Sequence, residues 1–337
     1  MDLETFDTAD LHVRLTKDLA KAAGLMSPTQ QRCMVDLYYQ IQEIRKGTAN
    51  QLRAALQVNE PNAFVDTMAT NLLRMEKTIV SALDKATDES VVGRWAKSQV
   101  GIGPVIAAGL AAYIDITQSP TPGALQRYAG LDAKAVWISA EKADAMVKAL
   151  RAEQPKAKVD EIIILAAAQL GRKVESLTKS TLRLGEGKLT FAALIKAISI
   201  RPWNANLKVL CWKIGDSFCK FHNHKDCFYG HLYAEHKAKT IAKNAAGGFE
   251  DMARDTLSAK TFKDKKTREI YESGHIPDGR VENQARRKAV TMFLYHYFEV
   301  AYTAHYGKRP PKPYILATQP DVHTHYIAPP LWTPDVE

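Results

Sequence analysis

The run Gly101-Ile102-Gly103-Pro104 is the stretch of the chain best suited to hold an anion. Glycines permit positive φ angles and let a foreign backbone approach closely, and Pro104 suits the first turn of a following helix. Unpaired N–H groups at a helix N-terminus carry partial positive charge and bind phosphate. The pattern predicts a helix-hairpin-helix whose amides at Gly101, Gly103 and Val105 grip a sugar-phosphate backbone without reading bases. The alternative is a plain turn between helices with no ligand.

Several cations elsewhere in the chain are candidate supports for this hairpin. Arg286, Arg287 and Lys288 stand near the start of a long predicted helix, and Arg127 lies in a short helix after the hairpin. Cations that track a phosphate strand release counter-ions, so binding should weaken steeply with salt. A second basic run lies within residues 260–268. Either run could equally be a solvated helix face.

Two thiols and two imidazoles stand close together in a nine-residue segment, at Cys219, His222, His224 and Cys227. Zinc takes such ligands in a tetrahedral arrangement. The spacing fits no standard zinc finger, however, because it places all four ligands in one loop. We therefore favour a solvated turn and expect no cofactor.

Residues after the hairpin strengthen its interpretation. The run 101–108, Leu125 and Tyr128-Ala129-Gly130-Leu131 resemble the helix-hairpin-helix domain of the DEDD transposases of the insertion-sequence 110/116/902 family. Less specific similarity continues in 206–210, 228–233 and 285–288, so the resemblance covers roughly residues 94–315. It implies a recombinase-derived module, of phage or mobile-element type, that docks on DNA or structured RNA.

Catalysis is a separate question. Members of that family pair this domain with a RuvC-like nuclease fold that bears four metal-binding acids, and two-metal chemistry needs carboxylates that converge on a rigid sheet. Residues 1–100 show no strand that carries an Asp. The family's serine nucleophile has Ser139 as its nearest candidate here, although Ser139 before Glu141 and Lys142 is also typical of a helix N-cap.

We therefore expect a nucleic-acid-binding protein that does not cleave its ligand. The first alternative is an active transposase or recombinase that uses Ser139 as nucleophile, with Mg²⁺ held by acids from another source. The second alternative is a structural or interaction protein in which the hairpin only packs.

Apolar residues at helical spacing, with no alternating strand pattern, predict an all-α fold. The expected helices are 8–23, 27–56, 62–83, 88–97, 124–131, 140–152, 158–170, 191–200, 205–221, 229–244 and about 278–306. The basic segment 173–188 is expected to form loops or short helices.

This pattern divides the chain into three parts. Residues 1–97 form a helical arm that could make the protein a homo-oligomer, most simply a dimer. Residues 98–310 form the hairpin domain, with an insertion at about 134–200, and residues 311–337 form a Pro-rich tail that cannot be regular helix.

Charge and composition bound these interpretations. The 337 residues carry a formal charge of +9, with −1 in residues 1–100, +4 in 101–200 and +6 in 201–337. This distribution favours a polyanion-binding surface in the last two thirds, or simply a soluble basic protein. The N-terminus lacks a signal sequence, the longest apolar run (162–170) is too short to span a membrane, and there are four cysteines. We therefore expect a cytoplasmic protein without a membrane partner.

Overall fold

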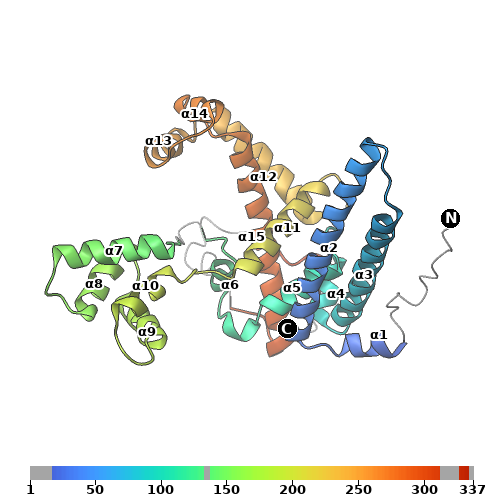
Figure 1. Ribbon diagram of the computed structural model, residues 1–337, viewed down its shortest axis with the longest axis horizontal. Helices are drawn as coiled ribbons and strands as arrows, with labels where there is room; N and C mark the ends of the chain where they lie inside the picture. Colours follow the sequence, from blue (N-terminus) through green and yellow to red (C-terminus); the bar gives the residue numbers. More distant parts are fainter. Residues whose placement is uncertain (1–16, 133–136, 312–325, 334–337) are drawn as a thin grey trace. The chain divides into compact units, whose positions relative to one another are not determined.

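The computed structural model describes residues 17–132, 137–311 and 326–333, and every regular element in those ranges is a helix (Figure 1). This confirms the predicted all-α fold. The chain forms two compact units, one made of residues 1–126 and 206–337 and the other of Arg127–Ala205. The predicted arm (1–97) therefore shares a unit with the hairpin, and the second unit roughly matches the predicted insertion.

The first four helices are α1 (Lys17–Gly24), α2 (Pro28–Gln57), α3 (Ala63–Asp88) and α4 (Val91–Ser98). Recognisable caps open three of them, α2, α3 and α4. Ser27 caps α2 in a capping box with Gln30, and Asn62 caps α3. Helix α3 continues to Asp88 rather than ending at residue 83, so α4 begins three residues later than expected, after its cap Ser90. Residues 8–16 of the first expected helix lie outside the described ranges.

Helices α2 and α3 form a long antiparallel pair (Figure 1) that is buried only at one end. Near that end, Val35 and Leu83 pack against Ala108 of α5 (Pro104–Tyr113). The Arg45–Glu76 ion pair, at 2.5 Å, joins the two helices further along. The opposite half of the pair exposes large apolar side chains.

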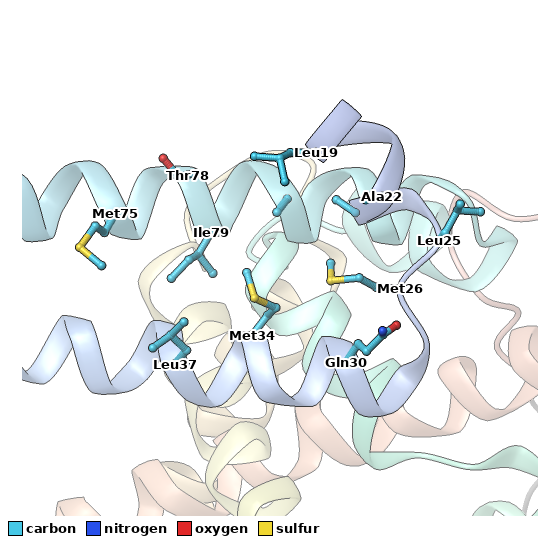
Figure 2. Close-up of a pocket in the computed structure, with 12 residues that line it drawn as sticks. Leu19, Ala22, Leu25, Met26, Gln30, Met34, Leu37, Met75, Thr78 and Ile79 are labelled. Atoms are coloured by element: carbon cyan, nitrogen blue, oxygen red, sulfur yellow. The ribbon is translucent and has the colours of Figure 1, made fainter. Parts of the chain in front are cut away.

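An apolar hollow of about 580 Å³ lies where α1 crosses the α2–α3 pair (Figure 2). Three methionines line it, Met26, Met34 and Met75, together with Leu19 and Ile79. Figure 2 shows these side chains converging from the three helices and, for Met26, from the segment that joins α1 to α2. The arm therefore keeps apolar surface that the described residues of this chain do not cover.

The rest of the first unit is built around two long helices. The remaining elements are η2 (Ile116–Gln118), α6 (Pro122–Tyr128), α11 (Ala205–Lys220), α12 (Phe228–Ala245), α13 (Glu250–Ala259), α14 (Lys265–Glu272) and α15 (Asp278–Tyr306). Helices α12 and α15 lie side by side, with the pair α13–α14 at their far end (Figure 1). The sequence patterns did not predict α13 and α14. An aromatic core joins Trp95 of α4, Phe218 of α11, Tyr229 of α12 and Phe293 of α15.

The described part of the Pro-rich tail, residues 326–333, returns to this core. Trp95 Nε1 and Gln99 Nε2 both donate to the carbonyl oxygen of Pro330, at 2.9 and 3.2 Å. His296 Nε2 lies 3.0 Å from the carbonyl oxygen of Ile327. Because a carbonyl only accepts, Nε2 carries the proton, and Nδ1 accepts from the Tyr229 hydroxyl at 2.8 Å. The tail thus ties α4 to α15.

The second unit is a small four-helix domain. Its helices are α7 (Ala140–Glu153), α8 (Val159–Leu170), α9 (Val174–Leu184) and α10 (Phe191–Ser199). They enclose a separate core that includes Val147, Ile162, Leu177 and Leu194. Much of the basic segment that was expected to form loops or short helices is the eleven-residue helix α9, because Leu177 and Thr181 supply a buried face.

Within the described ranges, no helix combines the length and the apolar character that crossing a membrane would require.

Protonation of His296, which contacts both Ile327 of the tail and Tyr229 of the core, should lower the stability of the protein at acid pH. Burial lowers the pKa of His296 to about 4, well below its usual 6.5. The unfolded chain therefore binds this proton more readily, so stability is lost as pH falls from about 6.5 towards 4. We expect urea unfolding at about pH 4.5 to show a loss, relative to pH 7, that is about 2 kcal/mol larger in the wild type than in His296→Gln. Equal losses in the two proteins would contradict this assignment.

Candidate nucleic-acid interface

The predicted hairpin is present between α4 and α5. Helix α4 ends at Ser98, and the N–H of Ile102 donates to the carbonyl of Gln99 at 3.0 Å, which closes the turn. Gly101 adopts φ +97°, a left-handed conformation that favours glycine. Pro104 then opens α5, with Gly103 as its N-cap. The glycine and proline positions thus have the conformational roles that the sequence predicted.

Gly101 is held against α11. Ser217 Oγ donates to the carbonyl oxygen of Gly101 at 2.6 Å. A Cβ at Gly101 would lie 3.0 Å from Ser217 Oγ and 3.4 Å from the Phe218 ring. The preceding carbonyl, of Val100, lies 3.5 Å from the Cys227 thiol. The turn is therefore fixed by its neighbours on one side.

Gly103 faces open space on the other side. A Cβ at Gly103 would meet no atom within 4 Å. Among the described residues, the N–H groups of Gly103, Val105 and Ile106 have no hydrogen-bond partner, and the first intrahelical bond of α5 runs from Ala107 N to Gly103 O at 3.0 Å. These amides stand at the positive end of α5. The three residues that carry them are partly exposed.

Arg286 is committed to carboxylates of its own chain. Its guanidinium lies 3.1 Å from Glu282 and 3.7 Å from Asp216, and its side chain is largely buried. Glu282 also accepts from Tyr233 at 2.5 Å and pairs with Lys237 at 2.7 Å. Burial by itself would raise the pKa of Glu282, but these partners lower it to about 2. Arg286 thus belongs to an ion network between α11, α12 and α15.

Helix α11 separates this network from the hairpin. Ser217, Phe218 and Phe221 face Gly101. Gly215, Asp216 and Cys219 face Arg286 on α15. At about 100° per residue, the centres of these two faces are roughly 160° apart. Arg286 therefore faces away from the hairpin, whereas the predicted roles of Arg287 and Lys288 in binding stay predictions.

Arg287 and Lys288 are exposed on α15. Burial lowers the pKa of His236 on α12, and the charges of Lys288 and Lys239 lower it further. This places Lys288 near His236 and Lys239, and Lys239 also pairs with Glu235. We call the exposed cations Arg287 and Lys288, together with His236 and Lys239, the α12–α15 basic face.

Arg127 belongs to the second unit, where its Nε lies 3.1 Å from Asp132. It is well exposed, and its part in binding stays a prediction. In the second basic run, Lys265 and Arg268 pair with Glu269 and Glu272 one turn further along α14. This arrangement matches the solvated-face interpretation for those two residues.

The four Cys and His side chains do not converge. Cys219 Sγ donates to Glu282 at 3.2 Å, and Cys227 is buried against Val100. His222 Nδ1 is 2.7 Å from the carbonyl of Cys219, and His224 Nδ1 accepts from the Asp226 N–H at 3.2 Å. Across residues 17–132, 137–311 and 326–333, no three His, Cys, Asp or Glu side chains are grouped as they would be around a metal ion.

Ser139 is the N-cap of α7. Its hydroxyl accepts from the backbone N–H of Lys142 at 3.4 Å, which is the capping role that the sequence also allowed. Its use as a nucleophile stays a prediction.

Some residues of this region could not be found from sequence patterns. Ser217 fixes the hairpin from more than one hundred positions away, and Phe218 follows it on α11. A serine inside an amphipathic helix carries no signal of such a contact. Comparisons with protein-family models, with curated proteins and with solved structures gave no match for this chain.

The two glycines should respond differently to the same small substitution. Gly101→Ala places a Cβ in a left-handed residue beside Ser217, so we expect it to destabilise the protein by about 1–2 kcal/mol. Gly103→Ala, at φ −92° and in open space, loses only the N-cap preference of glycine over alanine and should cost less than about 1 kcal/mol. Chemical denaturation of both variants measures this difference. Similar losses at both positions would show that Gly103 is packed rather than open.

Proposed function

We propose that this chain binds the sugar-phosphate backbone of DNA or structured RNA through the hairpin at 101–104, without cleaving it. The observation that supports this most directly is the set of amides at Gly103, Val105 and Ile106 that have no hydrogen-bond partner among the described residues. Gly103 also has open space where a Cβ would stand. Phosphate oxygens accept hydrogen bonds from such amides at helix N-termini. The resemblance to the insertion-sequence transposase domain points to the same ligand.

The hairpin offers hydrogen bonds more than charge. Its amides are neutral groups in a fixed arrangement, and a hydrogen bond to a charged acceptor contributes about 1.5–3 kcal/mol. The cations closest in sequence to the Ser217–Phe221 contact are Lys220, which pairs with Asp216 at 2.7 Å, and the exposed Lys225. We therefore propose that the hairpin fixes one phosphate while other surfaces supply most of the charge.

The α12–α15 basic face is the proposed source of that charge. Arg287 and Lys288 are exposed there, whereas Arg286 is retained by Glu282 and Asp216. Of the three predicted α15 contacts, we therefore keep Arg287 and Lys288 as direct phosphate ligands. Arg286 instead would support them by holding α11 and α15 together.

A recombinase that uses Ser139 remains the alternative function. The hydroxyl of Ser139 is engaged in capping α7, and no contact of Ser139 favours catalysis. We propose binding in preference to strand transfer, and a module descended from mobile elements as its origin.

Substitution at Gly103 should separate binding from folding. In Gly103→Asn the side chain can accept from the Ile106 N–H as an ordinary N-cap, so stability should rise by a few tenths of a kcal/mol. The same side chain occupies the amide that a phosphate would use, so we expect affinity for a DNA duplex to fall about tenfold. Gly103→Asp adds a negative charge and should weaken binding further.

Gly47→Asn is the control, because a Cβ at Gly47, inside α2 of the same unit, also meets no atom within 4 Å. Fluorescence anisotropy with labelled duplex, hairpin RNA and single strand measures all four proteins. Unchanged affinity in both Gly103 variants, with folding intact, would refute the hairpin as the binding site.

The salt dependence of binding should show that the cations which contact phosphate are on the α12–α15 basic face and not at the hairpin. The double variant Arg287→Gln with Lys288→Gln removes two phosphate contacts, so the slope of log affinity against log salt should fall by about 2. Gly103→Asn removes no cation, and its slope should match the wild type. A wild-type slope in the double variant would exclude the α12–α15 basic face.

We also propose that the arm makes the protein a homodimer. Apolar side chains far from the core are exposed at the free end of the α2–α3 pair, including Leu56 (66%) and Phe64 (72%). Exposed apolar patches of this kind mark interaction surfaces. Residues 1–100 sum to −1, whereas the rest of the chain is basic, so two arms can meet without strong repulsion.

The double variant Leu56→Glu with Phe64→Glu should be monomeric where the wild type is dimeric. The control Ile164→Glu changes another exposed apolar residue (54%), in the second unit, and should leave the dimer intact. Sedimentation velocity gives the mass of each species. A monomeric wild type, or a dimer in the double variant, would overturn this proposal.

A further inference from the structure

A cavity of about 390 Å³ with a mixed polar and apolar lining lies between α2, α5 and α11. Val209 and Leu210 of α11 contribute apolar side chains to the lining. Its polar side chains, which include Asp36, Gln40 and Lys213, come from segments that are far apart in the sequence. Its size is within the range of cavities that hold small ligands.

One wall of the cavity has its charges balanced. The Tyr113 hydroxyl donates to Asp36 at 3.0 Å, and Arg32 lies 3.9 Å from the same carboxylate. The Asn206 amide hydrogen-bonds to the Tyr113 hydroxyl. Burial and Asp36 together raise the pKa of Tyr113 to about 12, so this phenol stays neutral. Asp36 is thus already paired within the wall.

The cavity also contains a cation, Lys213. Its ammonium lies 2.9 Å from the centroid of the Tyr39 ring. Among the described residues, no carboxylate lies within ion-pair distance of it, and the nearby Glu43 pairs with Lys46 at 2.9 Å. Burial lowers the pKa of Lys213 and the charge of Lys46 lowers it further, whereas the charge of Glu43 raises it. The ammonium has therefore lost part of its hydration without forming a direct ion pair in exchange.

We propose that this cavity binds a small phosphate monoester on a polar organic body, such as a nucleoside monophosphate, with Lys213 paired to the phosphate. A lysine suits phosphate as a point charge, and the cavity lacks the arginine fork that recognises planar carboxylates. The cavity is larger than a phosphate ion, and the Gln40 and Asn206 amides line it. These amides can hydrogen-bond to the hydroxyls or the base edge of the organic part.

The proposed site is separate from the hairpin. Tyr113 is the last residue of α5 and Gly103 is its N-cap, so the two ends are about 15 Å apart along the helix. Loss of one site should therefore leave the other intact. The proposal does not depend on nucleic-acid binding.

Isothermal titration of the full-length protein with adenosine monophosphate tests the site, with adenosine and inorganic phosphate as separate probes. We expect adenosine monophosphate to bind at least about tenfold more tightly than either fragment. Lys213→Gln should weaken its binding about tenfold or more, whereas Lys213→Arg, which keeps the charge, should stay within about threefold. Lys148→Gln, which removes an exposed lysine of the second unit, is the matched control and should bind like the wild type.

Three results would overturn the proposal. The first is no binding of the monophosphate by the folded wild type. The second is equal affinity in Lys213→Gln and Lys148→Gln. The third is loss of binding in Gly103→Asn but not in Lys213→Gln, which would place the anion at the hairpin. Comparable affinity for inorganic phosphate alone would refute the role of the organic body.

Discussion

The rest of the first unit depends on the contact between Gly101 of the hairpin and Ser217 and Phe218 of α11. Ser217 and Phe218 hold Gly101 in its left-handed conformation, and this sets the direction in which α5 leaves the turn. Two further glycines bring neighbours close to α11. A Cβ at Gly109 would lie 2.9 Å from Leu210, and one at Gly215 would lie 3.2 Å from Val290. Helix α11 is thus enclosed between α5 and α15.

This arrangement places the hairpin amides, the ion network around Glu282 and the Lys213 cavity at different parts of α11. On the hairpin side, Ser217 and Phe218 of α11 contact Gly101, next to amides that have no partner among the described residues. On the α15 side, α11 contributes Asp216 and Cys219 to the network around Glu282, which retains Arg286. Near its middle, it carries Lys213, which lines the cavity with α2 and α5. In the proposed complex, backbone donors of the hairpin hold a phosphate, and Arg287 and Lys288 supply charge from α15.

Local signals in the sequence were sufficient for much of the fold. Caps such as Ser27, Asn62 and Ser139, and the glycine–proline turn, act within a few residues, and their outcome is readable from spacing. Helices α13 and α14 escaped prediction because each is short and the cluster that buries their apolar residues includes Ile276 and Val281 from beyond them. Local propensity is a weak guide when burial comes from elsewhere.

The candidate site was harder to predict, for the same physical reason. Arg286 looked like a free cation because its partner Asp216 lies seventy positions away, and one turn of spacing to Glu282 did not show that the pair is buried. The cavity around Lys213 draws on α2, α5 and α11, and nothing in their separate patterns indicates that they meet. Which cations remain available to a ligand is decided by tertiary pairing and not by composition.

The central claim is that the first amides of α5 contact the ligand, and amide-resolved NMR tests it most directly. On titration of the ¹⁵N-labelled protein with a DNA duplex, the N–H signals of Gly103, Val105 and Ile106 should shift most among the residues of α4, α5 and α11. Inorganic sulfate should move the same signals in the same direction at higher concentration. If these three signals stay in place while the duplex shifts others, the hairpin is a packing element and the ligand binds elsewhere.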